Sequence, residues 1–182
     1  MPRRAVSMQI MAVATAMLFA FAQLAQADMA RFVGSYQGSA EVIAADGTKI
    51  PRDMSVTIKK TRDAFEVTWT SVTYRPDGRA KEKSYTIAFV PTDRPGVFAA
   101  AQQKNVFGHS VQLDPMKGEP YVWAQLNGDT LSVYSLFVSE TGGYALQQYD
   151  RTLSDGGLQL RFQNIRNGAI ARAVETFLAR VE

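Results

Sequence analysis

Hydrophobic and polar residues alternate along most of the chain from residue 32 onward. In residues 54–59, for example, Met54, Val56 and Ile58 fall on one face of an extended chain, and polar residues occupy the other. Alternation with a period of two is typical of strands that bury one face. Nine strand candidates follow from this pattern: residues 32–45, 54–59, 65–74, 83–90, 97–101, 121–126, 130–139, 144–153 and 158–165.

Tight turns join nearly all of these segments. Dipeptides such as Asp46-Gly47 and Asn127-Gly128 stand between consecutive candidates, and such dipeptides favour β-hairpins. No helical pattern of about ten residues separates the strands, which argues against a parallel α/β sheet. A Greek-key sandwich needs long crossovers, and only the irregular residues 102–120 could supply one. We therefore predict an all-β fold, a single antiparallel up-and-down meander barrel of about eight to ten strands.

The last segment, residues 169–182, allows two interpretations. Its apolar residues, from Ile170 to Val181, fall on one face of a helix, and its Ala, Arg and Glu residues favour helix. The preceding Asn167-Gly168 dipeptide favours a hairpin instead. Because a meander with an open edge exposes unpaired backbone groups, we expect a closing strand here.

Residues 1–27 differ from the rest of the chain. Arg3 and Arg4 precede an apolar stretch at residues 10–22, and Ala25-Gln26-Ala27 matches an A-x-A cleavage site. These three parts predict a secretory signal peptide, followed by one barrel domain at residues 28–182. An uncleaved anchor is the alternative, but the apolar stretch is shorter than the roughly 20 residues of a spanning helix. We expect a periplasmic or secreted protein without a transmembrane anchor.

Composition narrows the possible functions. The 182-residue chain has 20 basic and 17 acidic residues, and loss of Arg3 and Arg4 with the signal would leave 18 against 17. This nearly neutral balance gives no reason to expect a nucleic-acid partner. The absence of cysteine excludes disulfides, cysteine-based metal sites, a thiol nucleophile and a lipidated cysteine. The sequence leaves the oligomeric state open.

A short motif at the start of the first strand candidate resembles one in a known group of barrels. Gly34-Ser35-Tyr36 stands where lipocalins carry Gly-x-Trp, with tyrosine in place of tryptophan. With the strand pattern, it makes the chain similar to calycin-type barrels, the lipocalin-like and fatty-acid-binding-like proteins. The resemblance implies that a late arginine stacks on the Tyr36 ring. The candidates are Arg161, Arg172 and Arg180.

Candidate catalytic residues are few. His109 is the single histidine, and it lies in the irregular segment with Asp114 and Glu119 as possible acid–base partners. A surface histidine is the simpler interpretation, and we expect Asp114 to be a turn former. The sequence contains no nucleophile elbow or calcium loop, and we expect no metal or cofactor. The basic residues at 79–83 fit a solvated hairpin end better than a membrane-binding patch.

Aromatic residues recur on nearly every predicted strand and suggest a pocket. Tyrosine and tryptophan inside a barrel offer apolar walls and single hydrogen-bond donors, which suit a small ligand. Gln147, Tyr149 and Arg151 share one face of their strand, but a register shift of one residue would invert which face is buried. The proposed aromatic pocket residues are Trp69, Tyr85, Trp123 and Tyr134, and the proposed polar anchors are Gln125 and Arg151.

Three functions are consistent with the sequence. The first is an exported lipocalin-like barrel that binds a small, largely apolar molecule without a covalent bond. The second is a fully packed barrel with a structural or partner-binding role in the cell envelope. The third is a barrel isomerase or cyclase, for which only His109 and the tyrosines would be available.

Overall fold

The structure, a computed structural model, describes residues 29–43, 48–62, 64–101, 103–104, 110–111 and 114–181. The predicted signal peptide and His109 lie outside these residues. The strands of the barrel are β1 (Gly34–Ile43), β2 (Lys49–Lys60), β3 (Phe65–Tyr74), β4 (Ala80–Pro91), β5 (Val97–Ala100), β8 (Tyr121–Asn127), β9 (Thr130–Val138), β10 (Tyr144–Ser154), β11 (Gly157–Arg166) and β12 (Ala169–Arg180).

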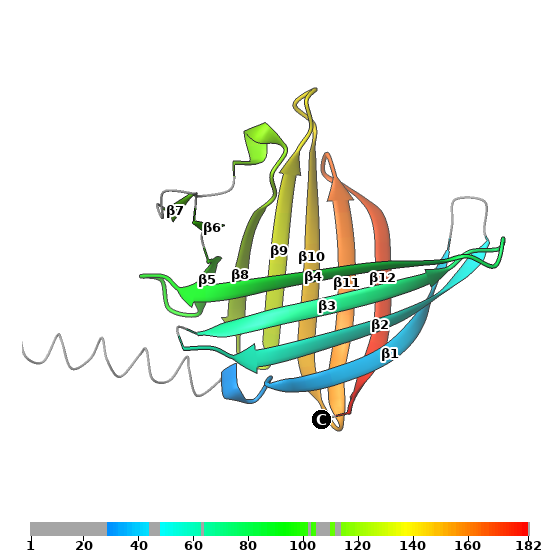
Figure 1. Ribbon diagram of the computed structural model, residues 1–182, viewed down its shortest axis with the longest axis horizontal. Coiled ribbons are helices and arrows are strands. Elements are labelled where there is room, and N and C mark those ends of the chain that lie inside the picture. The colour runs from blue at the N-terminus through cyan, green and yellow to red at the C-terminus, as the bar shows by residue number, and fades with distance from the viewer. Residues whose placement is uncertain are drawn as a thin grey trace, which may run out of the picture.

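Ten antiparallel strands of the described chain close into a barrel in the order β1-β12-β11-β10-β9-β8-β5-β4-β3-β2. Each strand pairs with its neighbours in sequence, apart from the β5–β8 and β12–β1 contacts, so the chain runs up and down around the wall. In Figure 1, β1 to β4 cross the front and β8 to β12 run behind them at a steep angle. The predicted all-β meander barrel is confirmed.

The C-terminal segment is a strand, as predicted. β12 pairs along its length with β11 and closes the barrel on β1 through the partners Tyr36–Arg180 and Gln37–Ala179. The two strands come very close at this seam. A Cβ at Gly38 would clash with the backbone carbonyl oxygen of Phe177. Glycine therefore gives β12 the room to approach β1.

The interruption predicted at residues 102–120 lies between β5 and β8 in the sequence. Its described parts are a two-stranded sheet of β6 (Gln103–Lys104) and β7 (Ser110–Val111) and a single 3₁₀ turn, η1 (Pro115–Lys117). Asp114 caps η1 by accepting a hydrogen bond from the Met116 amide, so its position fits the predicted turn-forming role. In the described part of the chain, no helix is long and apolar enough to span a membrane.

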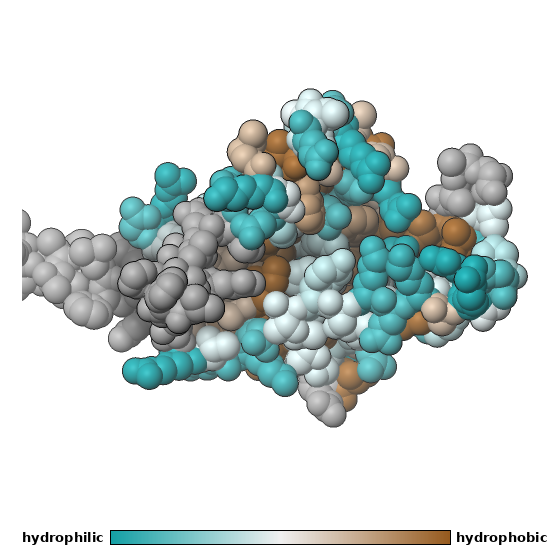
Figure 2. Space-filling view, turned by 45° about the horizontal axis from the view of Figure 1, so that its top comes forward, coloured by the Kyte–Doolittle hydropathy of each residue, from teal (hydrophilic) through white to brown (hydrophobic). Residues whose placement is uncertain are grey.

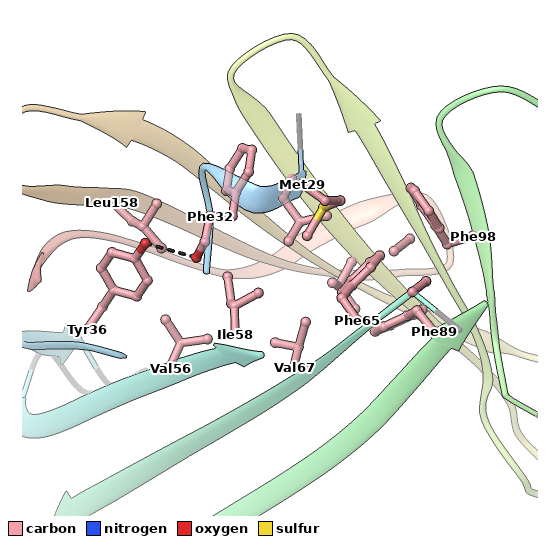
Figure 3. Packing of buried hydrophobic residues seen from close by; sticks show 14 of the residues in the cluster. Met29, Phe32, Tyr36, Val56, Ile58, Phe65, Val67, Phe89, Phe98 and Leu158 are labelled. Carbon is pink, nitrogen blue, oxygen red and sulfur yellow. Dashed lines mark hydrogen bonds between the residues drawn. The ribbon is translucent and has the colours of Figure 1, made fainter. Parts of the chain in front are cut away.

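One half of the barrel interior is filled with apolar side chains. Phe65 packs at its centre, stacked on Phe89 at 5.0 Å between ring centroids and edge-on to Phe98 at 4.9 Å. Met29 and Phe32, from a helical turn ahead of β1, point into the same cluster (Figure 3). Close packing of this kind excludes both water and ligand, so this half of the barrel is structural.

The aromatic residue of the short N-terminal motif belongs to this packed half. The Tyr36 ring is buried, and its hydroxyl donates a hydrogen bond of 2.9 Å to the Phe32 carbonyl (Figure 3). The Arg180 guanidinium lies over the ring, 5.4 Å from its centroid, and donates to the Val33 carbonyl. Among the three candidate arginines, Arg180 takes this position because the register of β12 sets it opposite Tyr36.

Candidate functional site

The other half of the interior is hollow. A cavity of about 480 Å³ lies between the first parts of β2, β4 and β12 and the facing parts of β3, β10 and β11. Its volume falls in the range of roughly 300–1,000 Å³ that is usual for small-molecule sites. Its lining includes Met54, Val56, Trp69, Ser71, Tyr85, Gln147, Tyr149, Arg151, Leu160, Phe162, Asn164, Val174 and Leu178.

The strand register decides which side chains enter this cavity. On β10, Gln147, Tyr149 and Arg151 line the cavity, whereas Gln148 and Asp150 occupy the opposite face of the strand. Residues that are direct partners across an antiparallel pair lie on the same face. The partners of these three residues on β11 are Asn164, Phe162 and Leu160, and they line the cavity as well. The two strands therefore form a continuous part of the cavity wall.

Four aromatic rings form a chain across this cavity. Trp69 of β3 stacks on Tyr85 of β4 at 5.6 Å and meets Tyr149 of β10 at 5.5 Å. Tyr149 in turn contacts Phe162 of β11 at 4.7 Å. Because the rings come from both sides of the barrel, together they offer an extended apolar surface to a bound molecule.

A charged side chain lies against the rings. Arg151 is 1% exposed, and its guanidinium carbon sits 5.8 Å from the Trp69 ring centroid and 5.4 Å from that of Tyr149. Its Nε and Nη1 atoms have no hydrogen-bond partner in the described structure. Burial lowers the pKa of Arg151 to about 10. Cation–π contacts stabilise the guanidinium partly, but they leave these two donors without an acceptor.

The carboxylate nearest to Arg151 in sequence is occupied elsewhere. Asp150 accepts hydrogen bonds of 2.6 Å from the Ser132 hydroxyl and of 3.0 Å from the Gln148 amide, on the other face of the strand. No ion pair of the described structure includes Arg151. The buried guanidinium therefore has no ion-pair partner, and the charge of Asp150 favours it only from across the strand.

Further cations surround the mouth of the cavity. They are Arg52, Arg75, Lys81, Lys83 and Arg172, and no Asp or Glu lines the cavity among the described residues. Glu82, which lies between the two lysines, is on the opposite face of β4. Residues 79–83 are exposed beside the turn between β3 and β4, as predicted for a solvated hairpin end, and Lys81 and Lys83 also line the cavity. Figure 2 shows hydrophilic residues at the right of the molecule, the end where β3 joins β4 in Figure 1.

Two of these mouth cations repel each other. Burial and the neighbouring Arg172 both lower the pKa of Arg52, and the Arg52 Nε donates a hydrogen bond of 3.0 Å to the Thr73 hydroxyl. Like charges held close together without an acid between them create a strongly positive local potential. A negatively charged group would relieve this repulsion.

The six sequence-based site residues separate into two groups. Trp69, Tyr85 and Arg151 come together in the cavity. The other three are on β8 and β9 and do not line the cavity. On these strands the buried apolar residues point to one face, and the three predicted residues point to the other. These three are Trp123, Gln125 and Tyr134. Trp123 and Tyr134 stack on each other at 4.8 Å, a cross-strand pair that supports the wall itself.

The sequence analysis did not predict that the cations around the cavity mouth belong to the site. Arg52, Met54 and Val56 occupy every second position of β2 and share one face. That spacing is equally typical of a strand whose end is polar and solvent-exposed, so it does not predict a cation at a binding site. Only the pairing of β2 with β3 places Arg52 beside Thr73 at the rim. In the described residues, no group of three His, Cys, Asp or Glu side chains could hold a metal ion.

Comparison with known proteins gives a likeness in fold only. No protein-family model and no curated protein sequence matches the chain. A phycobiliprotein lyase, CPES from Guillardia theta, is 9% identical over 85% of this chain and 90% of its own, with a TM-score of 0.36. Zebrafish ileal bile acid-binding protein in complex with cholic acid is 14% identical over 83% and 99%, with a TM-score of 0.34.

Proposed function

We propose that this protein is an exported barrel that binds a small, lipophilic molecule non-covalently in its cavity. The observation that carries the proposal is the hollow half of the barrel, walled by the ring chain of Trp69, Tyr85, Tyr149 and Phe162. Rings held at fixed positions bury the apolar surface of a ligand at a low cost in conformational entropy.

Unpaired polar atoms favour binding over a purely structural role. Nε and Nη1 of Arg151 and the side-chain oxygen of Asn164 are buried without a partner in the described structure. Each such atom costs free energy unless water or a ligand meets it. A barrel that served only as a packed structural unit would gain stability from apolar side chains at these positions. The polar atoms are better explained by a bound molecule.

Export is the part of the proposal that rests on residues 1–27. Their charged start, apolar stretch and Ala25-Gln26-Ala27 site support secretion to the periplasm or the medium. The test is expression of the full chain in a bacterial host followed by mass spectrometry of the exported fraction. We expect a mature N-terminus at Asp28. An intact N-terminus in the membrane fraction would contradict cleavage, and an intact chain in the cytoplasmic fraction would contradict export.

The two tryptophans of the chain make binding directly measurable. Trp69 lines the cavity and Trp123 does not, so Trp123→Phe leaves one tryptophan inside and Trp69→Phe leaves one outside. We would titrate each variant with N-phenyl-1-naphthylamine, an uncharged lipophilic probe. The expected result is a saturable change of tryptophan emission in Trp123→Phe and little change in Trp69→Phe. Equal responses, or no binding by the unmodified protein, would overturn the proposed site.

A further inference from the structure

We propose that the natural ligand is an amphiphilic organic anion, whose negatively charged group pairs with Arg151 while its apolar body lies along the aromatic rings. This inference rests on the proposed function and names the class of molecule that the cavity selects. It departs from the largely apolar ligand that the sequence suggested, because the structure adds charge to the binding surface.

The first support is the buried guanidinium itself. A buried ion is costly unless a partner of opposite charge contacts it, and no ion pair of the described structure includes Arg151, whose Nε and Nη1 also lack a hydrogen-bond partner. Asp150 is held on the other face of β10 by Ser132 and Gln148. An anion bound in the cavity would supply the missing acceptor, and guanidinium donors suit planar carboxylates and similar groups.

The second support is the sign of the charges along the cavity. Six cationic side chains line it, counting Arg151, and no acidic residue does so in the described structure. The chain as a whole is close to neutral in charge, with 20 basic and 17 acidic residues, so this one-sided distribution is local. A positive entrance raises the rate at which anions enter and disfavours cationic ligands.

The third support is the position of Arg151 among the rings. Its guanidinium lies 5.4 Å from the Tyr149 ring centroid and 5.8 Å from that of Trp69, so an anion on Arg151 also brings the attached body against both rings. The remaining wall of Phe162, Val174 and Leu178 is apolar. The site therefore combines a charge-specific contact with an extended apolar surface, which is the pattern of an amphiphile.

The test uses two fluorescent probes that differ by one anionic group. 8-Anilino-1-naphthalenesulfonate carries a sulfonate on the same ring system that N-phenyl-1-naphthylamine presents without charge. Their Kd values would be measured for the mature protein, for Arg151→Met and Arg151→Lys, and for Arg161→Met as a matched control. Arg161 lies on β11 opposite Asp150, on the outer face, where it pairs with Glu175.

We expect the sulfonate to bind about tenfold more tightly than the uncharged probe, a difference of about 1.4 kcal/mol. Arg151→Met should remove most of this preference while leaving the uncharged probe bound, because only the cations at the mouth then remain. Arg151→Lys should keep part of the preference, and Arg161→Met should keep all of it. Equal affinities for the two probes, or an equal loss of both in Arg151→Met, would overturn the anionic ligand but not the binding function. Failure of both probes to bind the unmodified protein would overturn both proposals.

Discussion

Arg151 is the largest fully buried side chain of the described barrel, and no ion pair of the described structure includes it. Its pKa is lowered to about 10 because burial penalises the charged form. For a base, a lowered pKa in the folded state means that the charged form destabilises the fold at every pH below about 10. The residue therefore costs stability in the free protein, as side chains in binding sites commonly do.

Removing this charge should stabilise the free protein. We expect Arg151→Met to raise the free energy of unfolding by about 1–4 kcal/mol, because methionine fills similar space without desolvating a charge. Urea denaturation at neutral pH measures the effect. The outer-face control Arg161→Met should change stability by no more than about 0.5 kcal/mol. A clear loss of stability in Arg151→Met would mean that the guanidinium already has a compensating partner.

Tyr149 should make stability depend on alkaline pH. Burial raises the pKa of its hydroxyl above the ordinary value of 10.0, so the folded state holds this proton more tightly than the unfolded chain does. Its contribution is then complete below about pH 10 and is lost as the pH rises through the folded-state pKa.

The comparison of the protein with Tyr149→Phe isolates this contribution. The variant also loses the hydrogen bond of 3.2 Å from the Tyr149 hydroxyl to Gln147, but that loss is the same at every pH below the titration. We expect the stability advantage of tyrosine over phenylalanine to shrink from about pH 10 upward in urea melts. A difference that stays constant to pH 11 or above, on the order of one pKa unit past the ordinary value, would contradict the raised pKa.

Among the strands, β12 decides whether the sheet becomes a barrel. Its pairing with β11 is extensive, whereas its described partners on β1 are only Tyr36 and Gln37. The stacking of Arg180 on Tyr36 and the close approach at Gly38 add to this short seam. Closure matters because it removes the two exposed strand edges that a meander otherwise presents to solvent.

A methyl group at the seam should weaken closure. In Gly38→Ala the new Cβ would meet the carbonyl oxygen of Phe177, which is backbone and can move only with β12. We expect a loss of about 1–3 kcal/mol in the free energy of unfolding, measured by thermal or urea denaturation. The neighbouring Ser39→Ala, on an exposed position of the same strand, should stay within about 0.5 kcal/mol. Similar values for the two variants would contradict a tight seam at Gly38.

The molecule as a whole divides its interior between two tasks. The half that holds Phe65, Phe89 and Phe98 is packed and supplies stability, and the half that holds Arg151 is hollow and charged. The interior is therefore neither wholly a pocket nor wholly packed. This division lets the protein carry unpaired polar atoms at one end, because apolar burial at the other end offsets their cost.

Salt should separate the two sources of anion binding. Exposed charges at the mouth are screened when ionic strength rises from about 0.05 M to 0.5 M, whereas a buried contact with Arg151 is screened much less. We expect the association rate of 8-anilino-1-naphthalenesulfonate to fall several-fold over this range and its dissociation rate to change little. Stopped-flow fluorescence measures both rates. An association rate that does not depend on salt would exclude steering by the cationic mouth.

The sequence determined the strands, their turns and the closing segment. Hydrophobic alternation and turn chemistry depend on residues close in sequence, so they can be recognised without the tertiary structure. Asn167 and Gly168, for example, adopt the positive φ angles that a two-residue hairpin turn requires. The composition also showed that cysteine chemistry is absent. Even the stacking of a late arginine on Tyr36 followed from a short motif, although not which arginine would supply it.

The tertiary structure alone decided which face of each strand looks inward and how the strands register. Trp69 and Trp123 occupy similar alternating patterns, yet one lines the cavity and the other lies on the opposite face from the core of its strand. Lys83 and Arg52 come from separate strands and share a cavity only because β3 pairs with both β2 and β4. A shift of one residue would exchange the two faces at no cost to the local pattern, so charge and aromatic surface converge only when the closed barrel sets the register.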